Sequence, residues 1–126
     1  MARIMICDDS MFMRMQLKKI LEKAGHIVVA EAEDGMDAIE HYRAFKNEID
    51  IVTMDITMPK LDGVSALKLL KSEFPQVKVI MVSATGMEGK VIECAKLGME
   101  NFVVKPYKEA ILLNAIKIVS DKYGIK

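Results

Sequence analysis

The sequence predicts an α/β fold, in which helices cover both faces of a central parallel β-sheet. Three observations support this prediction: apolar strand-like runs alternate with segments of helical period, the runs are nearly continuous in apolar residues, and a helix follows each run. Strands that are apolar on both sides belong to a sheet buried on both faces, which is the usual setting of parallel strands. The expected architecture is therefore a doubly wound sandwich of five strands and five helices.

The strand and helix segments follow one another as five units. Strand-like runs at residues 3–7 (RIMIC), 27–32 (IVVAEA) and 49–54 (IDIVTM) precede helical patterns at 11–23, 35–46 and 64–74. The runs at 77–82 (VKVIMV) and 101–105 (NFVVK) precede helices at 88–97 and 108–122. No Gly/Ser-rich linker or long repeat interrupts this alternation, so residues 1–126 are predicted to form one domain. Turn residues lie at the joints, namely Gly25, Gly35, Gly63, Gly86, Gly98 and Pro106.

The composition limits the possible classes of function. Hydrophobic residues make up 52% of the 126 residues and charged residues 29%, with a formal net charge of zero. This is a globular composition without a basic arm, so no nucleic-acid partner is expected. Neither a signal-peptide core nor an apolar run of spanning length is present, which predicts a cytoplasmic protein without membrane insertion. Cys7 and Cys94 lack the spacing of a zinc site or a disulfide framework and are predicted to be buried free thiols.

Polar side chains follow four of the five expected strands. Asp8 and Asp9 follow the first strand, Asp55 the third, Ser83 the fourth and Lys105 the fifth. Because functional groups in doubly wound sheets gather beyond the carboxyl ends of the strands, we expect these side chains at one edge. Three neighbouring carboxylates repel one another unless a cation lies among them. Two or three carboxylates offer hard oxygen ligands and leave coordination positions for water and a phosphate oxygen, which is the usual setting of Mg²⁺. The sequence therefore predicts a Mg²⁺ site.

These residues together suggest phosphoryl chemistry. Taken singly, each has a simpler explanation: Asp9 or Ser10 as a helix cap, Ser83 in a turn, Lys105 on the surface. Their joint placement instead predicts that Asp55 attacks a phosphoryl group, while Mg²⁺ held by Asp9 and Asp55, with Asp8 assisting, neutralises the developing charge. Lys105 and the Ser83 hydroxyl would bind phosphoryl oxygens. No Ser-His-Asp set, GxxxxGK[ST] loop or GxGxxG loop is present, which disfavours a nucleotide-dependent enzyme.

Four segments resemble the response-regulator receiver family, over essentially the full length and most closely its single-domain chemotaxis type. They are CDDSMFMR, MDITMPKLDG, VSA and FVVKPY. The resemblance implies a flavodoxin-like strand order of 2-1-3-4-5 and phosphorylation of Asp55 by a histidine kinase. It also implies that Asp9, Asp55 and the backbone carbonyl of Thr57 ligate Mg²⁺, and that the peptide bond between Lys105 and Pro106 is cis.

The resemblance further implies a conformational switch. The hydroxyl of Ser83 would move toward the phosphate, and the aromatic ring of Phe102 would swing inward. The alternative is that Phe102 is only a core residue of the fifth strand. The positions that govern phosphate loss in this family are Thr57 and Thr85; both are uncharged, so modest self-hydrolysis is expected and the involvement of a phosphatase stays open.

Output is expected through other proteins, because no effector domain follows the last helix. The resemblance implies docking on the fourth helix, fifth strand and fifth helix by a motor switch or adaptor protein, with the protein itself a monomer. A phosphorelay intermediate or phosphate sink is the alternative; a phosphohydrolase is disfavoured because Thr57 replaces the second Asp of a DxD motif.

Apolar residues of the first and last helices have expected roles in packing or docking. The expected core stripe of the last helix consists of Leu112, Ala115, Ile116, Val119 and Tyr123. Three further apolar residues of that helix are core or docking surface, namely Ile111, Leu113 and Ile118. The methionines of the first helix are expected to fill core gaps; they are Met11, Met13 and Met15.

Overall fold

A five-stranded parallel sheet forms the centre of the structure, a computed structural model that describes residues 1–126. The strand order is β2-β1-β3-β4-β5, as expected for a doubly wound, flavodoxin-like fold. A short 3₁₀ helix at Lys46–Glu48 extends α2. The strands are β1 (Arg3–Cys7), β2 (Ile27–Ala32), β3 (Ile51–Asp55), β4 (Val79–Ala84) and β5 (Asn101–Lys105), and the helices are α1 (Met11–Lys23), α2 (Gly35–Phe45), α3 (Gly63–Glu73), α4 (Glu88–Leu97) and α5 (Glu109–Tyr123).

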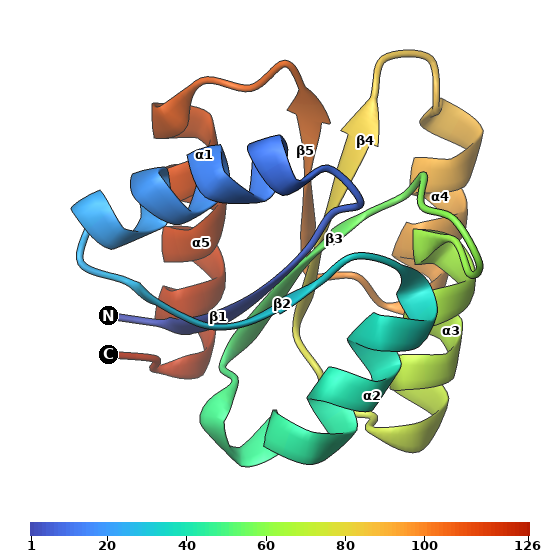
Figure 1. The fold of residues 1–126 in the computed structure, drawn as a ribbon, viewed down its shortest axis with the longest axis horizontal. Coiled ribbons are helices and arrows are strands. Elements are labelled where there is room, and N and C mark those ends of the chain that lie inside the picture. Colours follow the sequence, from blue (N-terminus) through green and yellow to red (C-terminus); the bar gives the residue numbers. More distant parts are fainter.

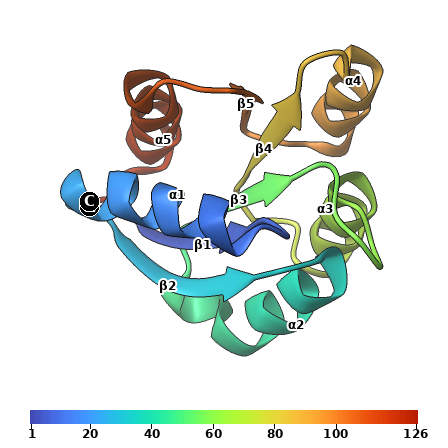
Figure 2. The same ribbon diagram turned by 45° about the horizontal axis from the view of Figure 1, so that its top comes forward.

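The helices form two layers around the sheet. Helices α1 and α5 cover one face, while α2, α3 and α4 cover the other (Figures 1 and 2). Side chains alternate along each strand, so Met5 and Cys7 of β1 join the larger core cluster and Ile4 and Ile6 join the smaller one. The central strands β1, β3 and β4 are buried along nearly their whole length because each face of the sheet meets a helical layer, whereas the edge strands β2 and β5 have exposed positions.

Two strands begin later than the apolar pattern predicts. Strands β3 and β4 begin at Ile51 and Val79, two residues after the apolar runs that identify them. Ile49 and Val77 are nevertheless buried, at 7% and 1% exposure. The apolar pattern therefore reports burial, which extends beyond the hydrogen-bonded ladder at these two strands.

The core stripe of α5 is confirmed except at Tyr123. Leu112, Ala115, Ile116 and Val119 are buried, but Tyr123 is 42% exposed. Its hydroxyl instead donates a hydrogen bond to Glu100, at 2.9 Å. The prediction that Tyr123 belongs to the core is wrong because an aromatic side chain with a polar tip can remain at the surface.

The methionines of α1 do not all fill core gaps. Met11 and Met15 are 68% and 56% exposed and lie on the solvent side of the helix, whereas Met13 is half-buried. Leu17 and Leu21 provide the buried contacts of α1. The filler interpretation is therefore wrong for Met11 and Met15.

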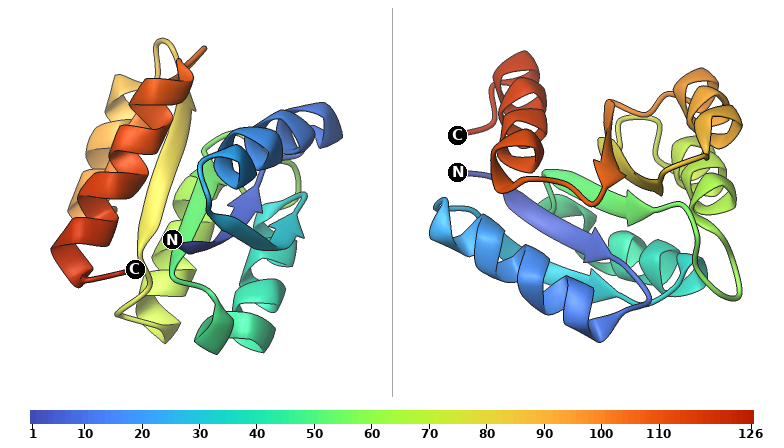
Figure 3. Two further views of the ribbon diagram at one scale, coloured as in Figure 1. Left: turned by 90° about the vertical axis from the view of Figure 1, so that its left-hand side faces the viewer. Right: turned by 90° about the horizontal axis from the view of Figure 1, so that it is seen from above.

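The first three helices have side-chain caps from Ser10, Asp34 and Asp62. The two chain ends lie side by side (Figures 1 and 3). Cys7 and Cys94 are buried free thiols, as predicted. None of the helices has the length and apolar character needed to cross a bilayer.

Candidate phosphoacceptor and metal site

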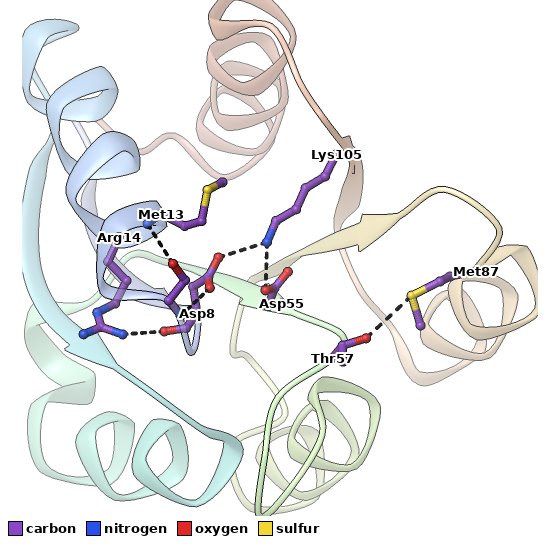
Figure 4. Close-up of polar contacts among 8 residues, drawn as sticks. Asp8, Met13, Arg14, Asp55, Thr57, Met87 and Lys105 are labelled. Carbon is purple, nitrogen blue, oxygen red and sulfur yellow. Dashed lines mark hydrogen bonds and ion pairs between the residues drawn. The ribbon is translucent and has the colours of Figure 1, made fainter.

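Four strands deliver the predicted polar side chains to one edge of the sheet, where Figure 4 shows Asp8, Asp55 and Lys105. Asp8 follows β1, Asp55 ends β3, Ser83 lies near the end of β4 and Lys105 ends β5. Strand β3 lies between β1 and β4, so Asp55 is central. The parallel register sets Ser83 beside Val104, one residue before Lys105. Topology thus collects residues that are up to 97 positions apart in sequence.

Lys105 bridges two of the carboxylates. Its Nζ lies 2.9 Å from Asp55 Oδ2 and 3.0 Å from Asp8 Oδ2. Both acids are buried, at 7% and 6% exposure, so these are charge-assisted hydrogen bonds shielded from solvent. Burial lowers the pKa of Lys105, but the hydrogen bonds that its ammonium donates to Asp55 and Asp8 raise the pKa overall above its ordinary value. Lys105 therefore remains an ammonium.

The three acids can surround a cation. One carboxylate oxygen from each of Asp8, Asp9 and Asp55 lies within 4.8 Å of the others. A single ammonium does not balance three carboxylates, and an all-oxygen donor set suits a hard divalent ion. The residues present thus fit Mg²⁺, and the acidic cluster predicted from the sequence is brought together.

Burial perturbs the titration of the central carboxylate. Desolvation raises the pKa of Asp55 to about 6; the Lys105 hydrogen bond opposes this rise, and the neighbouring Asp8 carboxylate adds to it. In the metal-free site the charged form of Asp55 is therefore less favourable than in water. A cation among the acids would reverse this effect.

Ser83 offers a hydroxyl without a partner. Its Oγ is buried and makes no hydrogen bond within the protein, although the residue is only 2% exposed. Buried hydroxyls are nearly always hydrogen-bonded in folded proteins. An orphaned hydroxyl near the end of β4, beside the strand that carries Asp55, is a group that a ligand oxygen would satisfy.

The loop after β3 packs closely against the phosphoacceptor candidate. The Gly63 N–H donates to the Ile56 carbonyl at 2.7 Å, and a Cβ at Gly63 would overlap the carbonyl oxygen of Asp55. Only glycine allows this approach, which brings the first turn of α3 next to Asp55. Sequence reasoning treated Gly63 as a joint and missed this contact.

The threonines predicted to govern phosphate loss are both exposed. Thr57 follows Asp55 by two residues, and its hydroxyl contacts the Met87 sulfur at 3.8 Å. The Thr85 hydroxyl lies 3.5 Å from the carbonyl oxygen of Lys105. The peptide bond that follows Lys105, to Pro106, is cis, in agreement with the resemblance.

Phe102 lies on the surface of β5. It is 43% exposed, so the alternative that it is a core residue is wrong. Phe102, Ser83 and Thr85 line a mostly apolar pocket of about 410 Å³ between α4 and β5. The ring therefore has a cavity beside it that reaches the candidate site.

Arg14 is a site residue that sequence reasoning missed. From the first turns of α1, its Nη1 donates a 2.6 Å hydrogen bond to the backbone carbonyl of Asp8 (Figure 4). The CDDSMFMR segment contains it, but nothing in the local pattern shows that the side chain folds back onto the loop before it. The role depends on a contact six residues away.

Comparisons with known proteins agree with this geometry. A family profile described as "Response regulator receiver domain" matches residues 4–117. The chemotaxis protein CheY of Bacillus subtilis is 48% identical over 114 residues, which cover 90% of this chain and 93% of that protein. CheY of Thermotoga maritima is 45% identical over 118 residues, covering 94% and 97% of the two chains.

Solved structures share the fold over nearly the whole chain. The crystal structure of a CheX-CheY-BeF3-Mg complex from Borrelia burgdorferi has a TM-score of 0.90 at 38% identity, covering 94% of this chain and 88% of that one. A response regulator receiver domain protein from Clostridium thermocellum has a TM-score of 0.92 at 27% identity, covering 99% and 98%. The strand order, the acidic cluster and the sequence identity to CheY proteins agree, and the chain belongs to the response regulator receiver domain family, as a CheY-like member.

Proposed function

We propose that this protein is a phosphorylation switch of a chemotaxis two-component system, with Asp55 accepting the phosphoryl group from a histidine kinase in the cytoplasm. The observation that carries the proposal is the setting of Asp55, whose Oδ2 lies 2.9 Å from the Lys105 ammonium and which shares a cluster of carboxylate oxygens with Asp8 and Asp9. The orphaned Ser83 hydroxyl supplies a further group for a phosphoryl oxygen. The identity to CheY proteins of two organisms supports the chemotaxis assignment.

The side chains divide the chemistry among them. An Asp55 carboxylate oxygen attacks phosphorus, the phosphorus–nitrogen bond of the phosphohistidine breaks with its electron pair moving to nitrogen, and the leaving imidazole takes a proton from solvent. Lys105 and the Ser83 hydroxyl bind the phosphoryl oxygens as charge shifts onto them. Mg²⁺, when held by Asp9, Asp55 and the Thr57 carbonyl with Asp8 assisting, supplies neutralisation of the phosphoryl charge. Lys105 and the Ser83 hydroxyl are already in place before phosphorylation, so the protein would assist its own phosphorylation.

Loss of the phosphoryl group requires an attacking water. Neither Thr57 nor Thr85 carries a carboxylate or an amide that could orient this water, and both are exposed. We expect modest self-hydrolysis, which leaves room for a separate phosphatase. The decay rate of the phosphorylated protein after removal of the donor measures this property.

The output partner would bind the face formed by α4, β5 and α5. This face carries Phe102, and exposed Val104 and Ile111 continue it. When Ser83 engages the phosphate, the Phe102 ring would turn into the adjacent pocket and change the shape of the face. A motor switch or adaptor protein would bind the altered face of the monomer.

Phosphotransfer from a candidate chemotaxis histidine kinase tests the proposal. Radiolabelled phosphate should pass from the kinase to the wild-type protein and to Asp121→Asn, an exposed carboxylate variant in α5, but not to Asp55→Asn. Labelling of Asp55→Asn at the wild-type rate would place the phosphoacceptor elsewhere. Capture with motor switch components supports the chemotaxis role, whereas transfer onward to a second histidine phosphotransfer protein would contradict it in favour of a relay.

A further inference from the structure

The Arg14 guanidinium joins three parts of the fold beside the acidic cluster. Its Nη1 lies 2.6 Å from the carbonyl oxygen of Asp8, and its Nε lies 3.2 Å from Glu31 Oε1 on β2. The side chain is only 13% exposed, although it begins on the first turns of a surface helix. Arg14 thus ties α1, the loop after β1 and the edge strand β2 together.

Every other polar group of Asp8 is already held by a different partner. Its N–H donates to the Ala32 carbonyl at 3.0 Å, its Oδ1 accepts from the Ser10 N–H at 2.9 Å, and its Oδ2 accepts from Lys105 at 3.0 Å. The carbonyl is the remaining group, and it belongs to the peptide that leads directly to Asp9. The hydrogen bond from Arg14 therefore fixes the plane of the Asp8–Asp9 peptide.

Asp9 depends on that peptide for its position. Asp9 is exposed, whereas Asp8 and Asp55 are buried, so packing does not hold its side chain in place. A rotation of the Asp8–Asp9 peptide would move the Asp9 carboxylate relative to the other two acids. Groups in the outer shell of a metal site set the orientation of the ligands in this way.

We propose that Arg14 is a positioning residue for the divalent-cation site: by holding the Asp8 carbonyl, it pre-arranges the Asp8 and Asp9 carboxylates around the ion. Arg14 makes its polar contacts with the Asp8 carbonyl and Glu31, not with Asp55, and acts through the two acids. Glu31 holds the guanidinium in place and offsets its charge. The inference rests on the proposed magnesium-dependent phosphorylation of Asp55 and names a residue that supports it.

Electrostatics and positioning predict opposite results when Arg14 is replaced. Removing a positive charge near a cation site should tighten Mg²⁺ binding by simple Coulomb attraction. Loss of the fixed peptide should weaken binding, by about 10–100-fold if Arg14 behaves as outer-shell partners usually do. The sign of the change in affinity therefore separates the two effects.

The experiment compares Mg²⁺ dissociation constants of the full chain by isothermal titration calorimetry. Arg14→Met keeps the apolar stem and removes the donors. Arg43→Met is the matched control, because Arg43 also pairs with a glutamate across two elements, Glu73 at 2.7 and 2.8 Å, but between α2 and α3. We expect weaker Mg²⁺ binding for Arg14→Met alone. Its phosphorylation by acetyl phosphate should need more Mg²⁺ for half-maximal rate yet recover at saturating Mg²⁺.

A second variant, together with the wild-type protein, distinguishes failure of the Arg14 inference from failure of the proposed function. Arg14→Lys keeps the charge and one donor but loses the planar fork, so a smaller weakening is expected; it decides the question if Arg14→Met does not fold in EDTA. A folded Arg14→Met, or Arg14→Lys in its place, that binds Mg²⁺ as tightly as wild type, or more tightly, would overturn the inference. If the wild type itself neither binds Mg²⁺ nor labels Asp55, the proposed function fails instead.

Discussion

Burial disfavours the charged form of the Asp55 carboxyl group. Its pKa is raised from 3.8 to about 6, so the folded state holds a proton that the unfolded state has released between these pH values. Stability contributed by this group is therefore lost as pH rises through about 6, because the charged form is poorly solvated in the fold. The sign is opposite to that of an acid stabilised by its partners.

Replacing Asp55 by asparagine should consequently stabilise the metal-free protein at neutral pH. In EDTA at pH 7 we expect the free energy of unfolding of Asp55→Asn to exceed that of wild type by on the order of 2 kcal/mol, and the difference to vanish near pH 4. Lys105 keeps Asp8 as a partner in the variant. Urea denaturation at several pH values measures the effect, with Asp121→Asn as an exposed control. If Asp55→Asn were less stable than wild type at pH 7, the charged Asp55 carboxylate would not destabilise the fold.

Ser83 should serve ligand binding rather than folding. Because its buried hydroxyl has no partner, Ser83→Ala is expected to leave the unfolding free energy unchanged or raise it by up to about 1 kcal/mol. The same change should weaken binding of BeF3⁻ with Mg²⁺ by about tenfold, since a hydrogen bond to a charged ligand is lost.

A second orphaned serine provides the control for this prediction. Ser120 also has a buried Oγ without a partner, yet it lies near the C-terminal end of α5, away from the acids. Ser120→Ala should match Ser83→Ala in stability but leave BeF3⁻ affinity unchanged. Equal BeF3⁻ affinity in both variants, measured by calorimetry, would remove Ser83 from the site.

At the scale of the elements, the loop between β3 and α3 depends on glycine at position 63. An added Cβ would overlap the Asp55 carbonyl oxygen, so Gly63→Ala must push α3 away from β3. We expect a loss of about 2–3 kcal/mol in the free energy of unfolding, as for other overpacked sites.

The matched control is Gly89 in helix α4. A Cβ there meets nothing within 4 Å, and alanine should raise stability by up to about 1 kcal/mol because it restricts the unfolded chain. Urea denaturation of both variants gives the comparison. A Gly63→Ala variant as stable as Gly89→Ala would show that α3 does not press on Asp55.

The sequence is sufficient to predict the elements because each is identified by a local pattern. Apolar runs locate the strands, and the rule that strand ends share one edge of a parallel sheet brings Asp8, Asp55 and Lys105 together. Arg14 and Gly63 could not be found this way, because their roles depend on contacts with backbone carbonyls that only the assembled fold defines. The prediction for Tyr123 is wrong for a related reason: helical periodicity places Tyr123 on the core stripe but does not show that its hydroxyl finds a partner in Glu100.

At the scale of the whole molecule, the proposed function requires that phosphorylation at one edge of the sheet changes a face that a partner binds. Phe102 is the proposed link, and the chain contains no tryptophan, so Phe102→Trp introduces a single fluorophore there. BeF3⁻ with Mg²⁺ should shift its emission to shorter wavelength as the ring enters the apolar pocket. Phe45→Trp, at an exposed aromatic position of α2 outside that face, should not respond. An unchanged spectrum at position 102 under saturating BeF3⁻ would exclude Phe102 from the switch.

The central claim is that Asp55 is a magnesium-dependent phosphoacceptor. Intact-mass measurement after incubation with acetyl phosphate tests it most directly, because the small donor removes any contribution from a kinase. We expect one phosphoryl group to be added to the wild-type protein with Mg²⁺, and neither EDTA-treated protein nor Asp55→Asn to be modified. Equal modification of Asp55→Asn, or of wild type in EDTA, would contradict it.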